Sequence, residues 1–447
     1  MADADRIFHA FRGVRYGTGE SRDLSAVIAP PYDVISEEKQ AELYARSERN
    51  FVRIELAQGS GDTRYAQASA TYRRWLSEGV LTRDAAPAFY VLEQEFTVEG
   101  RTWKRRGIFG LVRLPEANES FVLSHEGTLA APKADRLLLT QACRAMTSPI
   151  MMMSDDSDGA LMRVLDAAGG EPEATATSSD GTTNRIWVMR DPQAVSAASD
   201  AIGPGPLYIA DGHHRFETAC AYRDEMRRAY PDASPDAGFN HALALVNSSR
   251  DEGLRIFPTH RIVSGLDEAA RKRLSDCMER YFEVSTDRVD GVDPSADLAW
   301  LEEAAPGRGA FGVYRESHLY RLVAKEAALP ETGNVVDKLD VSILHSRLID
   351  PMLAGAGCDR HDDISHDSHA AGPTARGTRL TYTTDVREAI AAVDRGDYDC
   401  AFFLRPTRVS DVMEAARAGE RMPGKSTYFY PKIPAGLLVS DASENSI

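Results

Sequence analysis

Five consecutive residues in the middle of the chain have the types needed to bind a phosphate group. They are Asp211, Gly212, His213, His214 and Arg215, and they stand between an apolar run at 205–210 and an amphipathic segment at 215–230. A strand that stops here and continues as a helix directs backbone N–H groups and the positive helix end at one point. Gly212 allows close backbone approach, and the two histidines and the arginine add donors. We therefore predict that residues 212–215 bind phosphate.

Asp211 has a different predicted role, because an ionised carboxylate cannot donate a hydrogen bond to phosphate. It is a candidate general base, or a ligand for a divalent cation that bridges phosphate oxygens. The structural alternative is that Asp211 caps the helix while the histidines bind loop carbonyls. Two adjacent histidines next to Gly212 and Arg215 make this alternative the weaker one.

A second group of reactive side chains lies earlier in the chain, in the segment Ser-His-Glu-Gly-Thr at 124–128. His125 and Glu126 are candidates for general acid and base catalysis, and Thr128 is a candidate substrate contact. We expect this segment to fold against the turn at 211–215, because reacting atoms in a productive arrangement are about 3 to 3.5 Å apart. An equally supported alternative is a polar surface loop in which Asp135 caps a helix beginning near Leu137.

The segment 421–432 contains a Gly-Lys-Ser-Thr string that is similar to part of a P-loop. A P-loop is followed by a helix, whereas this string precedes a strand-like run, so we exclude a P-loop. The prediction that remains is that this segment contacts an anionic ligand. The alternative is that it forms an exposed loop. The candidate substrate-binding residues here are Lys425, Ser426, Thr427 and Lys432.

Three further polar segments lie at expected strand ends, at 29–33, 258–261 and 404–407. Each is a proline-containing turn that carries a charge, which is common both in binding sites and in purely structural turns. From them we take His260, Arg261 and Arg405 as candidate substrate contacts. The His- and Asp-rich run from His361 to His369 has no apolar anchors, so a solvated loop is favoured over a metal site, and no metal ligand is assigned.

The elements around these segments indicate a mixed α/β fold. We expect helices at 37–47, 63–79, 215–230, 266–282 and 339–353, with further helices at 386–396 and 409–420. Hairpins are expected at 88–114 and 311–324, strands at 241–248, 254–263, 380–384 and 400–406, and a last strand-like run at 426–439. We read 168–184 as part of another hairpin with an Asp-Gly turn and not as a linker. We expect an N-terminal region at 1–165 and a C-terminal region at 185–447, packed together around one site.

Composition limits the classes of function. The chain has 447 residues, is 43% hydrophobic and carries a formal charge of −16, which opposes binding to nucleic acid. Its first residues carry charges instead of an apolar signal, and no uncharged run is long enough to span a membrane. The five cysteines are widely spaced without a CxxC pair, as is typical of reduced cytosolic proteins. We expect a soluble cytoplasmic protein, whose oligomeric state the sequence leaves open.

Taken together, these segments resemble the bacterial and archaeal family catalogued as domain of unknown function 1015. The matching motifs follow one another in the expected order over almost the whole chain, at 29–34, 125–128, 210–215, 257–261, 405–407 and 425–432. The Asp-Gly-His-His-Arg turn is similar to the phosphate-binding motif of the ParB/sulfiredoxin-like fold, which implies such an element around residues 205–230. That fold includes free-serine kinases that use a nucleotide donor.

The resemblance implies a small-molecule phosphotransferase, with free L-serine as the first candidate acceptor. It places residues 211–215 on the phosphates of the donor and makes His125 and Glu126 candidates for activating the acceptor hydroxyl. ATP, ADP and pyrophosphate all fit such a turn, and nothing in the sequence resembles an adenine pocket, which favours pyrophosphate. We expect Mg²⁺ as the cofactor. A non-catalytic sensor of a phosphorylated metabolite is the alternative, and a ParB-like nucleic-acid protein is opposed by the acidic charge.

Overall fold

The computed structural model describes residues 6–17, 23–98, 100–288, 297–303, 309–330, 333–354 and 377–445. Contacts divide the chain into two compact units. The first comprises residues 1–124, 128–255 and 431–447, and the second comprises 125–127 and 256–430. The division therefore differs from the expected regions 1–165 and 185–447, because strands at 174–189 pair within the first unit and the chain returns to that unit at Pro431.

The first unit is built on a nine-stranded mixed sheet with the order β6-β11-β8-β12-β5-β4-β10-β9, and β1 pairs with the end of β5. Most neighbours are antiparallel, whereas β11 pairs with β6 and β12 pairs with β8 in parallel. The strands are β1 (Phe8–His9), β4 (Phe89–Val98), β5 (Arg101–Arg113), β6 (Val122–Leu123), β8 (Ile150–Ser154), β9 (Ala174–Thr177), β10 (Thr183–Met189), β11 (Leu207–Asp211) and β12 (His241–Ser248).

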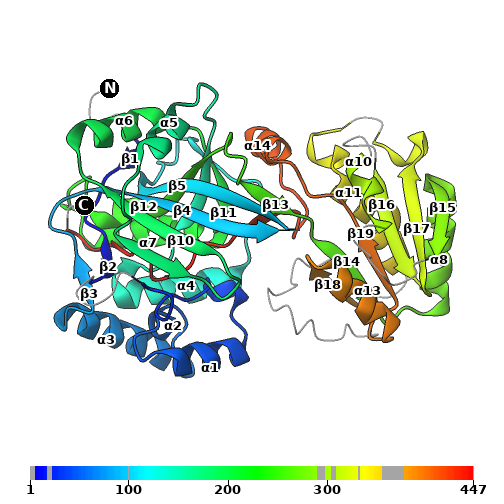
Figure 1. The fold of residues 1–447 in the computed structure, drawn as a ribbon, viewed down its shortest axis with the longest axis horizontal. Helices are drawn as coiled ribbons and strands as arrows, with labels where there is room; N and C mark the ends of the chain where they lie inside the picture. Colours follow the sequence, from blue (N-terminus) through cyan, green and yellow to red (C-terminus); the bar gives the residue numbers. More distant parts are fainter. Residues whose placement is uncertain are drawn as a thin grey trace. The chain divides into compact units, whose positions relative to one another are not determined.

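Helices cover this sheet because its central strands are apolar on both faces: every residue of β8 and β12 is buried. In Figure 1, α5 and α6 lie on one side of the strands and α1 to α4 on the other, and α7 packs on α4. The helices are α1 (Glu37–Arg46), α2 (Val52–Glu55), α3 (Thr63–Ser77), α4 (Ala130–Cys143), α5 (Ala160–Ala167), α6 (Pro192–Ile202) and α7 (His213–Ala229). Short strand pairs, β2 (Val14–Tyr16) with β3 (Leu81–Arg83) and β7 (Ala145–Met146) with β21 (Ser440–Asp441), complete the unit.

Both predicted hairpins of the first unit are confirmed. Strands β4 and β5 pair antiparallel over their length, and Gly100 has a left-handed φ of 76° in the turn between them. Strands β9 and β10 also pair antiparallel, and Gly181 has a φ of 84°, as an Asp-Gly turn requires. The segment at 168–184 is therefore part of the sheet and not a linker.

The second unit has a six-stranded sheet with the order β15-β17-β16-β19-β14-β18, in which all neighbours are antiparallel. Its strands are β14 (His260–Ser264), β15 (Phe282–Arg288), β16 (Ala310–Arg315), β17 (His318–Ala324), β18 (Arg379–Thr383) and β19 (Cys400–Phe403), and β13 (Arg255–Phe257) pairs separately with β20 (Tyr428–Tyr430). One apolar core joins β14, β16 and β19 to α10 (Trp300–Glu303) and α13 (Val386–Asp394). The remaining helices are α8 (Glu268–Tyr281), α11 (Asp340–Leu344), α12 (Asp350–Leu353) and α14 (Val409–Arg417).

Two expected elements of the second unit differ in the structure. The buried helix expected at 339–353 is interrupted between α11 and α12 by the π-helix η6 (His345–Ile349). The strand-like run at 426–439 forms only the short strand β20, because its chain then leaves the second unit.

The mixed α/β class is confirmed in both units. Among the helices that the structure describes, none is long and apolar enough to cross a membrane.

Candidate functional site

The candidate phosphate turn lies where β11 ends and α7 begins. Gly212 is the N-cap residue with a left-handed φ of 93°, and the helix starts at His213, two residues earlier than the expected start at Arg215. The N-cap residue is Gly212 and not Asp211, so the alternative in which Asp211 is the cap is wrong. The predicted order of strand, glycine turn and helix is confirmed.

Asp211 is held between two cations. One carboxylate oxygen accepts from Nζ of Lys432 at 2.5 Å, and the other accepts from Arg215 at 2.6 Å. Burial alone would raise the pKa of Asp211, but the charges of Lys432, Arg215 and His213 hold it well below its usual range. A carboxylate with so low a pKa is a weak proton acceptor. The geometry thus favours Asp211 as the anchor for both cations over a role as general base.

Arg215 folds back over the turn. Besides Asp211 it donates to the carbonyl of Pro149, and its side chain is almost fully buried. A Cβ on Gly212 would lie 2.9 Å from Nε of Arg215. Glycine is therefore required here both for its backbone conformation and for the space that Arg215 occupies.

Replacing Gly212 by Ala should destabilise the first unit more than the same change at Gly79. Both glycines have a left-handed φ, which costs an alanine about 1 to 2 kcal/mol, but a Cβ at Gly79 meets nothing within 4 Å. We expect Gly212→Ala to lose at least about 1 kcal/mol more than Gly79→Ala, because Arg215 must move. Urea unfolding followed by tryptophan fluorescence measures the difference. Equal losses would mean that the contact with Arg215 is unimportant.

Side chains from the start of α4 converge on the first turns of α7. The hydroxyl of Thr128 and Nζ of Lys133 both donate to the same oxygen of Glu217, at 2.5 Å and 2.7 Å. The backbone N–H of Leu129 donates to Nε2 of His214 at 2.8 Å. Nε2 of His214 is thus an acceptor, which leaves Nδ1 as its protonated nitrogen.

Helix α4 begins at Ala130, so the helix start expected near Leu137 is wrong. Proline is tolerated in the first turn of a helix, where its missing N–H is not needed, and Pro132 therefore does not delay the start. Asp135 lies inside α4 and does not cap it. Its carboxylate binds Arg64, Tyr65 and Arg136.

Arg105 is a residue of this site that sequence reasoning missed. It is almost fully buried in β5 and donates to Gln94 and, at 2.6 Å, to the carbonyl of Pro431. Gln94 in turn donates to the carbonyl of Lys432 at 3.2 Å. These bonds fix the backbone from which Lys432 reaches Asp211. Burial lowers the pKa of Arg105 to about 10, so it is charged at neutral pH.

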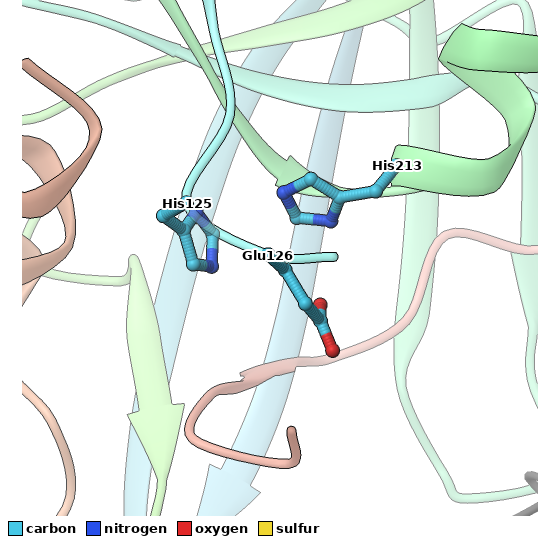
Figure 2. A group of neighbouring side chains, drawn as sticks. All are labelled: His125, Glu126 and His213. Carbon is cyan, nitrogen blue, oxygen red and sulfur yellow. The ribbon is translucent and has the colours of Figure 1, made fainter. Parts of the chain in front are cut away.

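Figure 2 shows His213, at the start of α7, with His125 and Glu126. His213 belongs to the first unit, whereas His125 and Glu126 are assigned to the second. Within the second unit, Nε2 of His125 lies 3.3 Å from the hydroxyl of Thr427, and its carbonyl accepts from the backbone of Met422 at 2.8 Å. The carbonyl of Glu126 accepts from Arg421. The segment 125–127 is therefore tied to the segment 421–427.

The other candidate residues of the second unit surround β14 and the segment 421–427. Arg261 donates to the carbonyl of Lys425 at 3.2 Å, whereas Arg405 is paired with Asp340 at 2.6 Å. The hydroxyl of Ser426 donates to the carbonyl of Pro423 at 2.5 Å. His260 lies beside Arg261 on β14 and is described below.

The P-loop is excluded by the structure as well. Gly419 stands five residues before Gly424, so the spacing alone matches the consensus. The segment nevertheless runs from the end of α14 into the strand β20, which is the reverse of strand, loop and helix. The run from His361 to His369 lies outside the described residues.

The fold and the turn define a two-unit α/β protein with a strand-to-helix turn surrounded by cationic side chains. A family model with the description "Protein of unknown function (DUF1015)" matches residues 8–342, and the chain belongs to this family. None of the curated proteins compared with the chain matches it.

Several solved structures are similar to this chain at low TM-scores. A conserved hypothetical protein from Pyrococcus furiosus is 15% identical, with 76% of this chain and 95% of that chain covered and a TM-score of 0.35. A free serine kinase in complex with AMP is 14% identical, with 74% and 92% covered and a TM-score of 0.34. SbnI with a C-terminal truncation from Staphylococcus aureus is 10% identical, with 75% and 88% covered and a TM-score of 0.33.

Proposed function

We propose that the protein is a small-molecule phosphotransferase that moves a phosphoryl group from pyrophosphate or a nucleotide to the hydroxyl of a small metabolite. The observation that carries the proposal is the gathering of donors at the start of α7, where Lys133, Thr128 and the helix N-terminus lie together. Phosphoryl transfer needs mainly positioning and neutralisation of charge, which such a group supplies. Free L-serine is the first acceptor to test, because the turn resembles that of free-serine kinases.

In the proposed reaction Lys133 and Thr128 move from Glu217 to the donor phosphate. Both now donate to one half-exposed carboxylate oxygen, and a phosphate oxygen offers them the same kind of acceptor with more charge. His213 and the backbone of the first turn complete the donor site. Asp211 keeps Arg215 and Lys432 in place, so that their charge is present without either side chain having to reorganise.

Glu126 is the proposed base for the acceptor hydroxyl. One residue separates it from Thr128, and consecutive Cα atoms are about 3.8 Å apart, so chain connectivity keeps its backbone close to the residue that binds Glu217 on α7. A glutamate in this position can accept the proton that the hydroxyl loses as the new O–P bond forms. The bond from the transferred phosphorus to the bridging oxygen of the donor breaks, and its electron pair leaves with inorganic phosphate when pyrophosphate is the donor, or with the shortened nucleotide when a nucleotide is the donor.

We propose that a divalent cation takes part, most simply Mg²⁺ bound to the donor. Mg²⁺ is usually held by one or two carboxylates together with substrate phosphates. Both oxygens of Asp211 are bound by cations, so we propose Glu126 as the carboxylate that contributes to the metal site.

The experiment that tests the function is a screen of donors against acceptors with the purified full-length chain. ATP, ADP and pyrophosphate are each combined with free amino acids and small alcohols, and product formation is followed by ³¹P NMR with Mg²⁺, with Mn²⁺ and with a chelator. We expect phosphoserine to form from at least one donor and the chelator to stop the reaction. If no donor transfers phosphate to any acceptor, the proposed function is wrong. If the reaction continues in the presence of the chelator, the proposed metal requirement is wrong.

Replacing Lys133 by Met should weaken binding of the donor. One charge-assisted hydrogen bond corresponds to about tenfold or more in affinity. Stability should change little, since half-exposed ion pairs contribute at most about 1 kcal/mol. Calorimetric titration with pyrophosphate measures the affinity, and Lys39→Met, which breaks another surface ion pair, is the control. An unchanged Kd would exclude Lys133 from the donor site.

A further inference from the structure

The second unit contains a buried arginine whose guanidinium contacts no carboxylate among the residues that the structure describes. Arg261 lies in β14 between β18 and β19, and its side chain is fully buried. Among the described residues its guanidinium donates to the carbonyls of Thr259 and Lys425 and, at 3.4 Å, to Nε2 of His345. The ring of Tyr382 lies 5.4 Å away. These neighbours are uncharged, since a histidine nitrogen that accepts is unprotonated, and a buried cation without an anion is costly.

The guanidinium of Arg261 has more N–H groups than the acceptors that the structure describes around it. It carries five N–H groups, and the three acceptors above account for three of them within the described part of the chain. Burial lowers the pKa of Arg261 to about 10, so the group is still charged at neutral pH. An oxyanion placed here would accept the remaining N–H groups and neutralise the charge in one step.

A second unsatisfied group belongs to the same stretch of chain. Thr259 is only 6% exposed, and its hydroxyl has no hydrogen-bond partner in the part of the chain that the structure describes. Thr259 immediately precedes β14, and its backbone carbonyl accepts from the guanidinium of Arg261, which keeps the two residues close together. A hydroxyl and a guanidinium from residues so close together are a suitable donor pair for an oxyanion.

His260 does not belong to this donor pair. It is the first residue of β14 and is adjacent to Arg261, so its side chain points to the other side of the sheet, where its ring packs edge-on against Phe403 at 5.1 Å. Burial lowers the pKa of His260 to about 3, so the ring is neutral and contributes no charge. The expected substrate contact at His260 is accordingly less suited to an anion than that at Arg261.

Two local distortions border Arg261. The carbonyl that it binds belongs to Lys425, a residue with a left-handed φ of 60°. The imidazole that accepts from Nε is that of His345, the first residue of the π-helix η6. Left-handed residues other than glycine and π-helical turns both occur preferentially at functional sites. Both distortions support a binding role for the surroundings of Arg261.

We propose that the second unit binds an oxyanion group of a small molecule, either a carboxylate or a phosphoryl group, through the guanidinium of Arg261 and the hydroxyl of Thr259. The inference deepens the proposed function and rests on it for its biological meaning. It requires that one of the substrates carries an anionic group in addition to the phosphate bound at the start of α7. A carboxylate would make the acceptor a hydroxy acid or an amino acid.

The test uses the full-length chain in a His213→Ala background, which weakens the candidate anion site of the first unit. Inorganic phosphate and acetate are titrated separately into this parent and into its Arg261→Met, Arg261→Lys and Thr259→Val derivatives, by calorimetry and by the rise in Tm on binding. We expect one of the two anions to bind the parent and to bind the Arg261→Met derivative about tenfold or more weakly. The affinities of the Arg261→Lys and Thr259→Val derivatives for this anion should lie between those of the parent and of the Arg261→Met derivative.

Acetate binding identifies a carboxylate, and binding of phosphate alone identifies a phosphoryl group. Binding of neither anion to the parent, or equal binding to all derivatives, overturns the proposal. If Arg261→Met does not fold, Thr259→Val and Arg261→Lys decide the outcome, because both nearly preserve side-chain volume. A failed search for phosphoryl transfer would leave these titrations unaffected, so the two proposals fail separately.

Discussion

Replacing Asp211 by Asn is expected to lower the free energy of unfolding of the first unit by roughly 3 to 5 kcal/mol. The substitution removes the anion but leaves two cations, Arg215 and Lys432, whose side chains are 9% and 16% exposed. Removal of one partner from a buried ion pair costs this much because the remaining charge is left uncompensated. Three of the four tryptophans, Trp75, Trp103 and Trp187, lie in the first unit, so urea unfolding followed by fluorescence reports on it.

The matched control for this substitution is Asp224→Asn on the same helix. Asp224 pairs with Arg223, but its side chain is 53% exposed, so the loss should be at most about 1 kcal/mol. If the two variants lose a similar free energy of unfolding, Arg215 and Lys432 do not need the charge of Asp211, because solvent stabilises their charges instead.

The effect of Asp211→Asn should also depend on pH. The pKa of Asp211 is lower in the folded than in the unfolded protein, so its charge stabilises the fold above the unfolded pKa of about 3.9. That contribution is lost as the pH falls below this value toward the folded pKa. The difference in stability between the native chain and the variant should therefore be full at neutral pH and shrink in acid. A constant difference down to the acid limit would contradict the ion-pair account.

The turn could be predicted from the sequence because everything that forms it is local. An apolar run, one glycine and an amphipathic segment follow each other between residues 205 and 230, and the structure places β11, Gly212 and α7 there. The histidines and the arginine are on the turn by their position alone. Only the start of the helix was misplaced, by two residues.

The partners of the turn could not be predicted, because they come from distant parts of the chain. Lys432 reaches Asp211 only because Arg105 and Gln94 bind the backbone at 431–432, and no periodicity in the sequence links these segments. For Glu217, the sequence does contain a signal that could have connected it to the turn. It stands four residues after His213 and hence on the same face of the helix, where its contact with Lys133 is at least conceivable from sequence.

The division into two units could not be predicted from the sequence, for the same reason. The N-terminal and C-terminal regions expected from the sequence follow chain order, but the first unit takes strands from both and a last segment from 431 onward. Pairing of β10 with β4 and the return of the chain at Pro431 are long-range events. That His125 and Glu126 serve one site with the turn stays a prediction.

Replacing Glu126 by Gln should have the largest effect on the proposed reaction. The amide keeps the size of the side chain but cannot take a proton, and loss of a general base typically costs about 10² to 10⁴ in rate. The donor phosphate is bound by other groups, so kcat should fall while donor affinity is unchanged, the pattern of an interaction made only in the transition state. Single-turnover transfer to L-serine and titration with pyrophosphate measure the two quantities. Glu42→Gln, on the exposed face of α1, is the control.

The outcome separates catalysis from mere binding. If Glu126→Gln transfers phosphate at the native rate, Glu126 is not the base, and because the low pKa of Asp211 makes it a weak base, Glu217 is the next carboxylate to test. Glu217→Gln would then be expected to show the loss. If the native chain binds pyrophosphate with no transfer and Glu126→Gln binds it equally well, the turn at 211–215 serves as a sensor of phosphorylated metabolites. In that case its cations are needed for affinity alone, and Lys133→Met should still weaken binding.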